Sequence, residues 1–171
     1  MFKKLFITTA LLAATTHAAF AGESYFGAGL GIQNSGGYNG IVSNIFGGYG
    51  STAGPTENYY VGGEIFANIG SLPLSSDHYN RTTYGFGISF IPGIYLNEYT
   101  IAYGRVGLEN SHFSRTNSTQ TGAQLGAGLQ TRVTNNWDVR AEYVYTGSGI
   151  ISHFGTTRSN QFNMGLIYKL N

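Results

Sequence analysis

The end of the chain alternates strictly in side-chain character, and this pattern limits the possible folds more than any other. One set of alternate positions is apolar: Phe162, Met164, Leu166, Tyr168 and Leu170. The positions between them are mostly polar or small: Asn163, Gly165, Ile167 and Lys169. A period of two residues predicts a β-strand with one apolar face.

The first 21 residues have the pattern of an export signal. A basic start, Met1-Phe2-Lys3-Lys4, precedes a short apolar run from Leu5 to Ala14 and a small-x-small cleavage site at Ala19-Phe20-Ala21. We therefore expect a signal peptide over 1–21 and one domain over 22–171. An exported chain built from one-faced strands is typical of the bacterial outer membrane, where a closed barrel leaves no backbone group unpaired in lipid.

Composition excludes several other classes of protein. The chain has no cysteine, which excludes a disulfide framework and thiolate metal sites. Its 26 glycines could suggest disorder, but 13 tyrosines, 11 phenylalanines and a net charge of +1 are the reverse of a disordered composition. No basic patch indicates nucleic-acid binding.

The mature chain divides into eight segments, most of them about ten residues long, enough for a tilted strand to cross the outer membrane. We predict strands at Ser24 to Gln33, Gly40 to Gly50, Tyr59 to Ile69, Tyr84 to Leu96, Tyr99 to Glu109, Thr121 to Val133, Trp137 to Thr146 and Gln161 to Leu170. The second segment has an unclear phase, because both of its faces carry apolar residues.

An even number of strands places both ends of the barrel domain on one side, which in outer-membrane barrels is the periplasm. Short turns are expected there, at Ser51 to Asn58, Asn97-Glu98 and Thr134 to Asn136. Longer polar loops are expected outside, at Ser71 to Thr83, Asn110 to Gln120 and Gly147 to Asn160, and the first outer loop, Asn34 to Asn39, is short. The predicted fold is an all-β, up-and-down, antiparallel transmembrane barrel with periplasmic termini. A soluble lipocalin-like barrel is the structural alternative, but it would place charge outside, whereas here the charged face is also the glycine-rich one.

Several segments resemble the OmpA-like and opacity-type family of eight-stranded outer-membrane barrels. They are Tyr25 to Gly31, Tyr60 to Glu64, Tyr103 to Gly107, Leu125 to Gly128 and, most specifically, Asn136-Trp137-Asp138-Val139-Arg140-Ala141-Glu142-Tyr143. The resemblance implies a small surface-exposed barrel, with roles in the family that include envelope integrity, adhesion and porin-like behaviour. The family usually ends on an aromatic residue, whereas this chain ends Tyr168-Lys169-Leu170-Asn171.

Six charged residues are predicted to face the lumen: Glu64, Arg105, Glu109, Arg132, Arg140 and Glu142. Glu64, Arg105 and Glu142 are expected in a middle layer, and Arg132 and Arg140 nearer the periplasm. Because an eight-stranded barrel is filled by side chains, we interpret these residues as a charge-paired core rather than a catalytic centre.

One motif allows an enzymatic alternative. His112-Phe113-Ser114 places a histidine and a serine on one strand face, as in lipid A deacylase barrels. Glu109, the nearest candidate for a third catalytic group, has the opposite parity, so we expect no enzymatic activity. His78, His112 and His153 are spread over three outer loops without local metal-ligand spacing, so neither a metal nor a cofactor is expected.

The expected function is that of a structural or surface-interaction protein with a charge-filled lumen, with a narrow porin-like channel as the alternative. The expected partners are outer-membrane lipid and lipopolysaccharide, the outer-membrane assembly machinery through the C-terminal strand, and a host or surface ligand at the outer loops. We also expect the protein to be a monomer in the outer membrane of a Gram-negative bacterium and not to bind nucleic acid.

Overall fold

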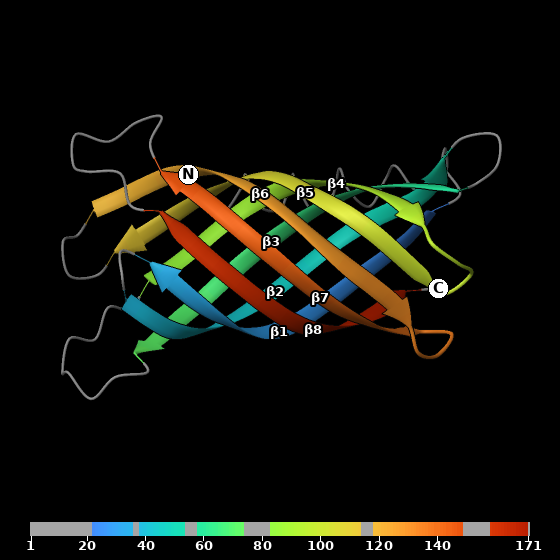
Figure 1. Cartoon of the computed structure of the whole chain (residues 1–171), viewed down its shortest axis with the longest axis horizontal. Coiled ribbons are helices and arrows are strands. Elements are labelled where there is room, and N and C mark those ends of the chain that lie inside the picture. The colour runs from blue at the N-terminus through green and yellow to red at the C-terminus, as the bar shows by residue number, and fades with distance from the viewer. Residues whose placement is uncertain are drawn as a thin grey trace.

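Eight antiparallel strands form one closed barrel (Figure 1). The computed structural model describes residues 22–35, 38–53, 58–73, 83–113, 118–148 and 158–170. The strands are β1 (Gly22–Ser35), β2 (Tyr38–Ala53), β3 (Tyr59–Pro73), β4 (Thr83–Tyr95), β5 (Thr100–Phe113), β6 (Ser118–Arg132), β7 (Trp137–Ser148) and β8 (Ser159–Leu170). The predicted eight-stranded meander is confirmed. Among the described residues, no helix is long and apolar enough to cross a membrane.

The barrel closes where β1 pairs with β8, in a register that runs from Ser24 opposite Leu170 to Ser35 opposite Ser159. Every strand therefore has two hydrogen-bonded neighbours and the sheet has no free edge. This closure is what allows a sheet to stand in lipid, because no edge strand is left with a row of unpaired backbone groups.

The two ends of the barrel differ. β1 begins and β8 ends at the end drawn on the right in Figure 1, together with the turns at residues 96–99 and 133–136. We call this the inner end and the opposite one the outer end. The Asn97 side chain closes the first of these turns, since its Oδ1 accepts hydrogen bonds from the backbone N–H groups of Tyr99 and Thr100.

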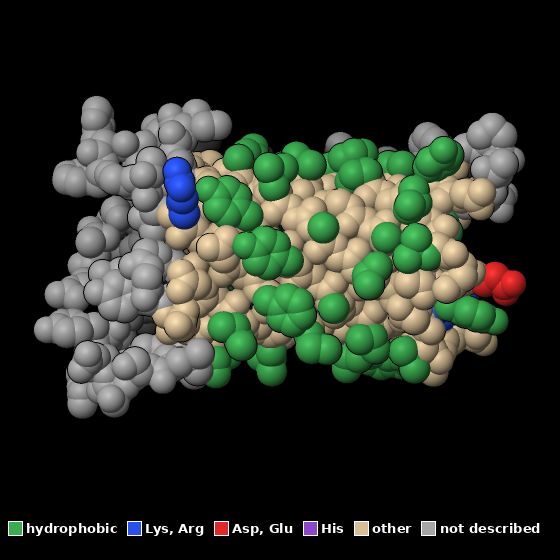
Figure 2. All heavy atoms as spheres, in the orientation of Figure 1, with side chains coloured by type: hydrophobic (Ala, Val, Ile, Leu, Met, Phe, Trp, Pro, Cys, Tyr) green, Lys and Arg blue, Asp and Glu red, His purple; other side chains and the backbone are tan. Residues whose placement is uncertain are grey.

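Side chains alternate between lumen and surroundings along each strand. Large apolar side chains point outward around the barrel, among them Phe26, Leu30, Ile45, Ile65, Phe86, Ile88, Phe90, Val106, Leu125, Leu129, Met164 and Leu166, all about half exposed or more. Figure 2 shows hydrophobic side chains spread between the two ends on the face in view, with charged side chains visible only near the ends. This apolar belt with a polar interior matches a membrane barrel and excludes the lipocalin-like alternative.

The strands extend further than the sequence pattern indicated. The predicted outer loop from Asn110 to Gln120 is wrong in extent, because β5 continues to Phe113 and β6 already begins at Ser118. Likewise β3 continues to Pro73 beyond the predicted end at Ile69. A polar segment can prolong an antiparallel ladder, since pairing satisfies its backbone groups whether or not lipid surrounds it.

Inward glycines make room for large rings in the lumen. Gly128 of β6 lies beneath Tyr103 of β5, and a Cβ added there would lie 2.6 Å from the Tyr103 Cζ and 2.7 Å from the carbonyl oxygen of Ala141. The backbone oxygen cannot move away without breaking the ladder. The glycine-rich inner face is therefore a packing requirement. A narrow lumen that holds tyrosine and phenylalanine rings needs strand positions without side chains opposite them.

The packing around Gly128 predicts that one added methyl group there destabilises the barrel. Gly128→Ala should lower the unfolding free energy by about 1–3 kcal/mol, because the added carbon overpacks the site and displaces Tyr103 from its hydrogen bond to Glu142. Gly63→Ala is the matched control, since a Cβ there meets no atom within 4 Å. Urea unfolding in lipid vesicles measures both variants, and equal stability of the two would contradict the packing argument.

Candidate functional site in the barrel lumen

Four charged side chains from three strands meet in the middle of the lumen. Arg105 of β5 lies 2.5 Å from the Oε1 of Glu64 on β3 and 3.0 Å from the Oε2 of Glu142 on β7. Arg140 of β7 binds the other oxygen of Glu64 at 2.5 Å. All four side chains are almost fully buried. We call Glu64, Arg105, Arg140 and Glu142 the central network.

Glu64 is the hub of the central network, because each of its oxygens binds a different arginine. Its Oε2 also accepts a hydrogen bond of 3.0 Å from the Tyr25 hydroxyl. Arg105 donates in addition to the Ser89 hydroxyl at 3.0 Å, and Tyr103 donates to Glu142 at 2.9 Å. Buried ions need this density of partners to offset the loss of water.

Arg140 is held by both polar and aromatic groups. Its Nη2 donates to the Oε1 of Gln130 at 2.8 Å. Its guanidinium carbon lies 4.7 Å from the ring centre of Phe46, 5.1 Å from that of Tyr103 and 5.6 Å from that of Tyr25. Such cation–π contacts gain strength in a dry interior. The strand position of Arg140 is nearer the inner end, as expected, but its long side chain reaches the middle layer.

Two of the six candidate lumen residues lie outside the central network. Arg132, the last residue of β6, is exposed at the inner end, so its expected place in the lumen network is wrong. The strand wall ends at this residue, and the side chain therefore reaches solvent. Glu109 is buried in the lumen but accepts hydrogen bonds from Asn68, Gln124 and Thr146 and forms no ion pair with any described residue.

The sequence did not lead us to predict a second charge cluster, which lies at the inner end. Lys169 of β8 lies 3.3 Å from Asp138 of β7 and 3.1 Å from Glu23 of β1. It thus joins the strands on both sides of β8, next to the point of closure. Strand parity could have found this cluster, because Asp138 and Lys169 both occupy inward positions of their strands.

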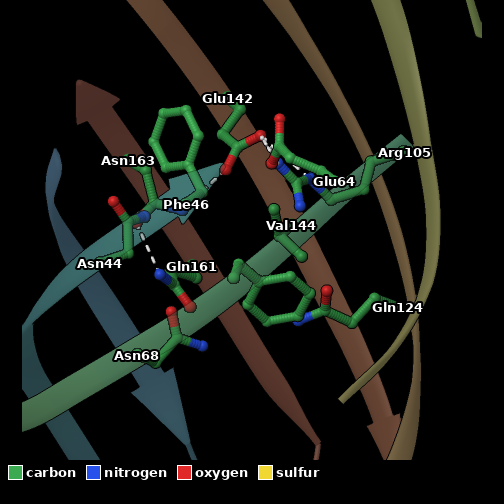
Figure 3. Close-up of a pocket in the computed structure, with 11 residues that line it drawn as sticks. Asn44, Phe46, Glu64, Asn68, Arg105, Gln124, Glu142, Val144, Gln161 and Asn163 are labelled. Atoms are coloured by element: carbon green, nitrogen blue, oxygen red, sulfur yellow. Dashed lines mark hydrogen bonds and ion pairs between the residues drawn. The ribbon is translucent and has the colours of Figure 1, made fainter. Parts of the chain in front are cut away.

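The rest of the described lumen is filled by apolar and amide side chains. Two buried apolar clusters consist of Tyr25, Phe46, Phe66 and Ile167, and of Tyr60, Ile91, Ile101 and Tyr103. The small cavity of Figure 3, bordered by Asn44, Phe46, Gln124 and Asn163 beside the central network, has a volume of about 10 Å³. That volume holds about one water molecule. The cavity is therefore too small for an organic substrate.

Comparison with known proteins agrees with this architecture. Residues 6–169 match the family described as outer membrane protein beta-barrel domain. The chain belongs to this family. The family and the fold place it in the outer membrane of a Gram-negative bacterium, with the inner end in the periplasm. None of the curated proteins matches the chain.

Solved structures of similar fold include several outer-membrane barrels. Neisserial surface protein A, from Neisseria, shares 18% identity over 87% of this chain and 97% of its own, with a TM-score of 0.60. Ail, the attachment invasion locus protein of Yersinia pestis, shares 18% identity over 87% of this chain and 97% of its own, with a TM-score of 0.55. The outer membrane enzyme PagL shares 13% identity over 81% of this chain and 97% of its own, with a TM-score of 0.58.

His112 lies near the outer end of the barrel, on the side of β5 that faces away from the lumen. The His112 ring lies 4.9 Å from that of Tyr84, and its Nδ1 is 3.2 Å from the Thr119 hydroxyl. No carboxylate among the described residues binds His112, and Glu109 is on the lumen side of the wall. The side chain of Ser114 lies outside the described residues, as do His78, His153 and the expected signal peptide.

Proposed function

We propose that this outer-membrane barrel is a structural surface protein that acts through its outer end, in attachment or envelope integrity, and that it has no enzymatic activity. The observation that carries the proposal is the filled lumen. A central network with two apolar clusters leaves no chamber for a substrate among the described residues. Contact with the surroundings is then left to the outer end and to the lipid-facing wall.

The charge of the connections supports an anionic contact at the outer end. Residues 74–82, 114–117 and 149–158, which join strands there, contain Arg81, Arg115 and Arg158 but only one acidic residue, Asp77. The inner connections carry Glu57 and Glu98. Opposite charges attract over nanometre distances, so a basic outer end favours phosphate and sulfated or acidic sugar groups. Lipopolysaccharide of the same membrane and polysaccharides of an external surface both present such groups.

Biogenesis completes the proposal. Residues 1–21 would be removed as a signal peptide after export, and β8 would serve as the signal for the outer-membrane assembly machinery. The barrel would then work as a monomer, since closure leaves no sheet edge for a second chain.

A polyanion-binding assay tests the proposed role. The probe is immobilised heparin with sucrose octasulfate as competitor, a heparin analogue that is in complex with Ail in a solved structure. Cells displaying the wild-type barrel should bind, and a variant with Arg81, Arg115 and Arg158 all changed to glutamine should lose most of the binding. Glu57→Gln with Glu98→Gln is the control at the other end. Equal binding by the arginine variant and the wild type would reject an anionic contact.

A narrow channel is the alternative function, and planar-bilayer recording separates it from the proposal. The central network and the apolar clusters should keep the wild-type conductance near the bilayer background. A steady conductance that Arg105→Ala or Arg140→Ala alters would instead favour the channel, because only an ion path through the lumen would depend on these residues.

A further inference from the structure

The apolar belt ends in one cross-strand row at the outer end of four neighbouring strands, β7, β8, β1 and β2. In this row Tyr143 pairs with Phe162, Phe162 with Ile32 and Ile32 with Ile41. All four side chains are exposed. We call them the apolar row. In a membrane barrel such a row contacts the acyl chains of lipids.

The next outward positions toward the outer end form a polar row. Here Tyr145 pairs with Asn160, Asn160 with Asn34 and Asn34 with Asn39. The three asparagines are exposed, and so is Arg158, which directly precedes β8 and is two residues from Asn160. Because neighbouring strands lie about 4.8 Å apart, a row across four strands is about 14 Å wide.

Two hydrogen bonds order the polar row and leave donors available. The Tyr143 hydroxyl donates to the Oδ1 of Asn160 at 2.7 Å, and the Nδ2 of Asn34 donates to the Oδ1 of Asn39 at 2.6 Å. The amide NH₂ groups of Asn160 and Asn39 then remain free to donate to a ligand. No Asp or Glu of the described residues lies on this outer surface, since Glu109 is buried in the lumen.

The other four strands lack this arrangement. Their corresponding row pairs Ile69 of β3 with Tyr84 of β4, Tyr84 with His112 of β5, and His112 with Thr119 of β6. It contains neither an amide nor an arginine. Amides and a guanidinium directly beyond an apolar row are therefore confined to one side of the described barrel.

We infer that this side of the barrel binds one phosphorylated, acylated disaccharide of the outer leaflet, the lipid A part of lipopolysaccharide. The acyl chains lie along the apolar row, and oxygens of the sugar headgroup accept hydrogen bonds from Asn160 and Asn39. Arg158 binds a phosphate, for which a guanidinium offers paired donors.

The shape of the surface selects this lipid. A disaccharide headgroup with several chains fits a row about 14 Å wide, whereas the single phosphate of a glycerophospholipid covers only part of it. A polysaccharide without acyl chains has nothing to place on the apolar row. The inference deepens the proposed anionic contact and rests on the outer end of the barrel facing the cell exterior.

Native mass spectrometry of the purified barrel in zwitterionic micelles measures the binding. Lipid A, phosphatidylglycerol and inorganic phosphate are titrated separately. Lipid A should bind one to one, with a dissociation constant at least about tenfold lower than that of phosphatidylglycerol. Inorganic phosphate should not displace it.

The first variant tests the guanidinium. Arg158→Gln should raise the dissociation constant for lipid A about tenfold, because a charge-assisted hydrogen bond to phosphate is lost. Arg132→Gln is the matched control, since Arg132 is also exposed but lies at the inner end. It should bind lipid A like the wild type.

A second pair of variants tests the amides. Asn34→Leu with Asn160→Leu should also weaken lipid A binding about tenfold, while the unfolding midpoint stays close to that of the wild type because both side chains are exposed. Asn110→Leu is the control: it removes an outward amide of β5 and its hydrogen bond to Thr121, on the other side of the barrel. Lipid A should bind this variant at full strength.

Three results would overturn the inference. One is equal affinity for lipid A and phosphatidylglycerol, and another is displacement of lipid A by inorganic phosphate. The third is a lipid A affinity that the Arg158 and asparagine variants leave unchanged, or that Asn110→Leu lowers equally. The proposed function fails separately: it is rejected by the heparin assay on cells, which contains no added lipid A.

Discussion

Glu64→Gln should lower the unfolding free energy of the barrel by about 3–5 kcal/mol, the cost of leaving buried charge without its partner. The substitution keeps the shape of the side chain but removes the charge that binds Arg105 and Arg140 together. Urea unfolding in lipid vesicles, followed through Trp137, measures the loss. Glu23→Gln is the control: its carboxylate binds Lys169 but is half exposed, so less than about 1 kcal/mol is expected.

Two double variants separate the charges of the central network. In Glu64→Gln with Arg140→Met, the remaining pair of Arg105 and Glu142, 3.0 Å apart, stays intact. Methionine can also occupy the aromatic surroundings of Arg140. About half of the stability lost in the single variant should therefore return.

The double variant Glu64→Gln with Arg105→Met should recover none of the stability that Glu64→Gln loses. It leaves Arg140 without its carboxylate and Glu142 without its arginine. If both double variants recover the same stability, or if the single substitutions are neutral and their effects simply add, the central network does not stabilise the barrel.

Ile88→Arg should destabilise the barrel by about 2–4 kcal/mol in lipid vesicles, because an arginine on the lipid face near the bilayer centre must be moved out of water. Ile88 is 61% exposed on the outer face of β4 and pairs with Ile65 of β3 and Leu108 of β5, inside the apolar belt. Unfolding free energies from urea titration provide the measurement.

Val133→Arg provides the comparison for Ile88→Arg. Val133 is 63% exposed, but it lies in the turn at the inner end, where the cost should be only about 0–1 kcal/mol. A barrel surrounded by water would tolerate both changes alike. Equal effects at the two positions would therefore contradict the placement of the belt in lipid.

The strand phases were predictable wherever one face was apolar and the other was not. β7 and β8 are the clearest cases, and the structure places Trp137, Val139, Phe162 and Leu166 outward as their alternation predicts. β2 is the contrary case, because Val42 and Phe46 are buried while Ile41 and Ile45 are exposed. Its phase follows only from its register with β1 and β3, including the shift between Val42 and Ser43.

Parity along each strand, with the even number of strands, was enough to predict the barrel, its orientation and the inward direction of Glu64, Arg105, Glu109, Arg140 and Glu142. It could not predict that Arg140 reaches Glu64, that Glu109 meets amides instead of an arginine, or that Arg132 leaves the lumen. A two-residue period specifies which face a side chain occupies. The tilt and stagger of the closed sheet decide its depth and the residue opposite it, and these arise only when β1 pairs with β8.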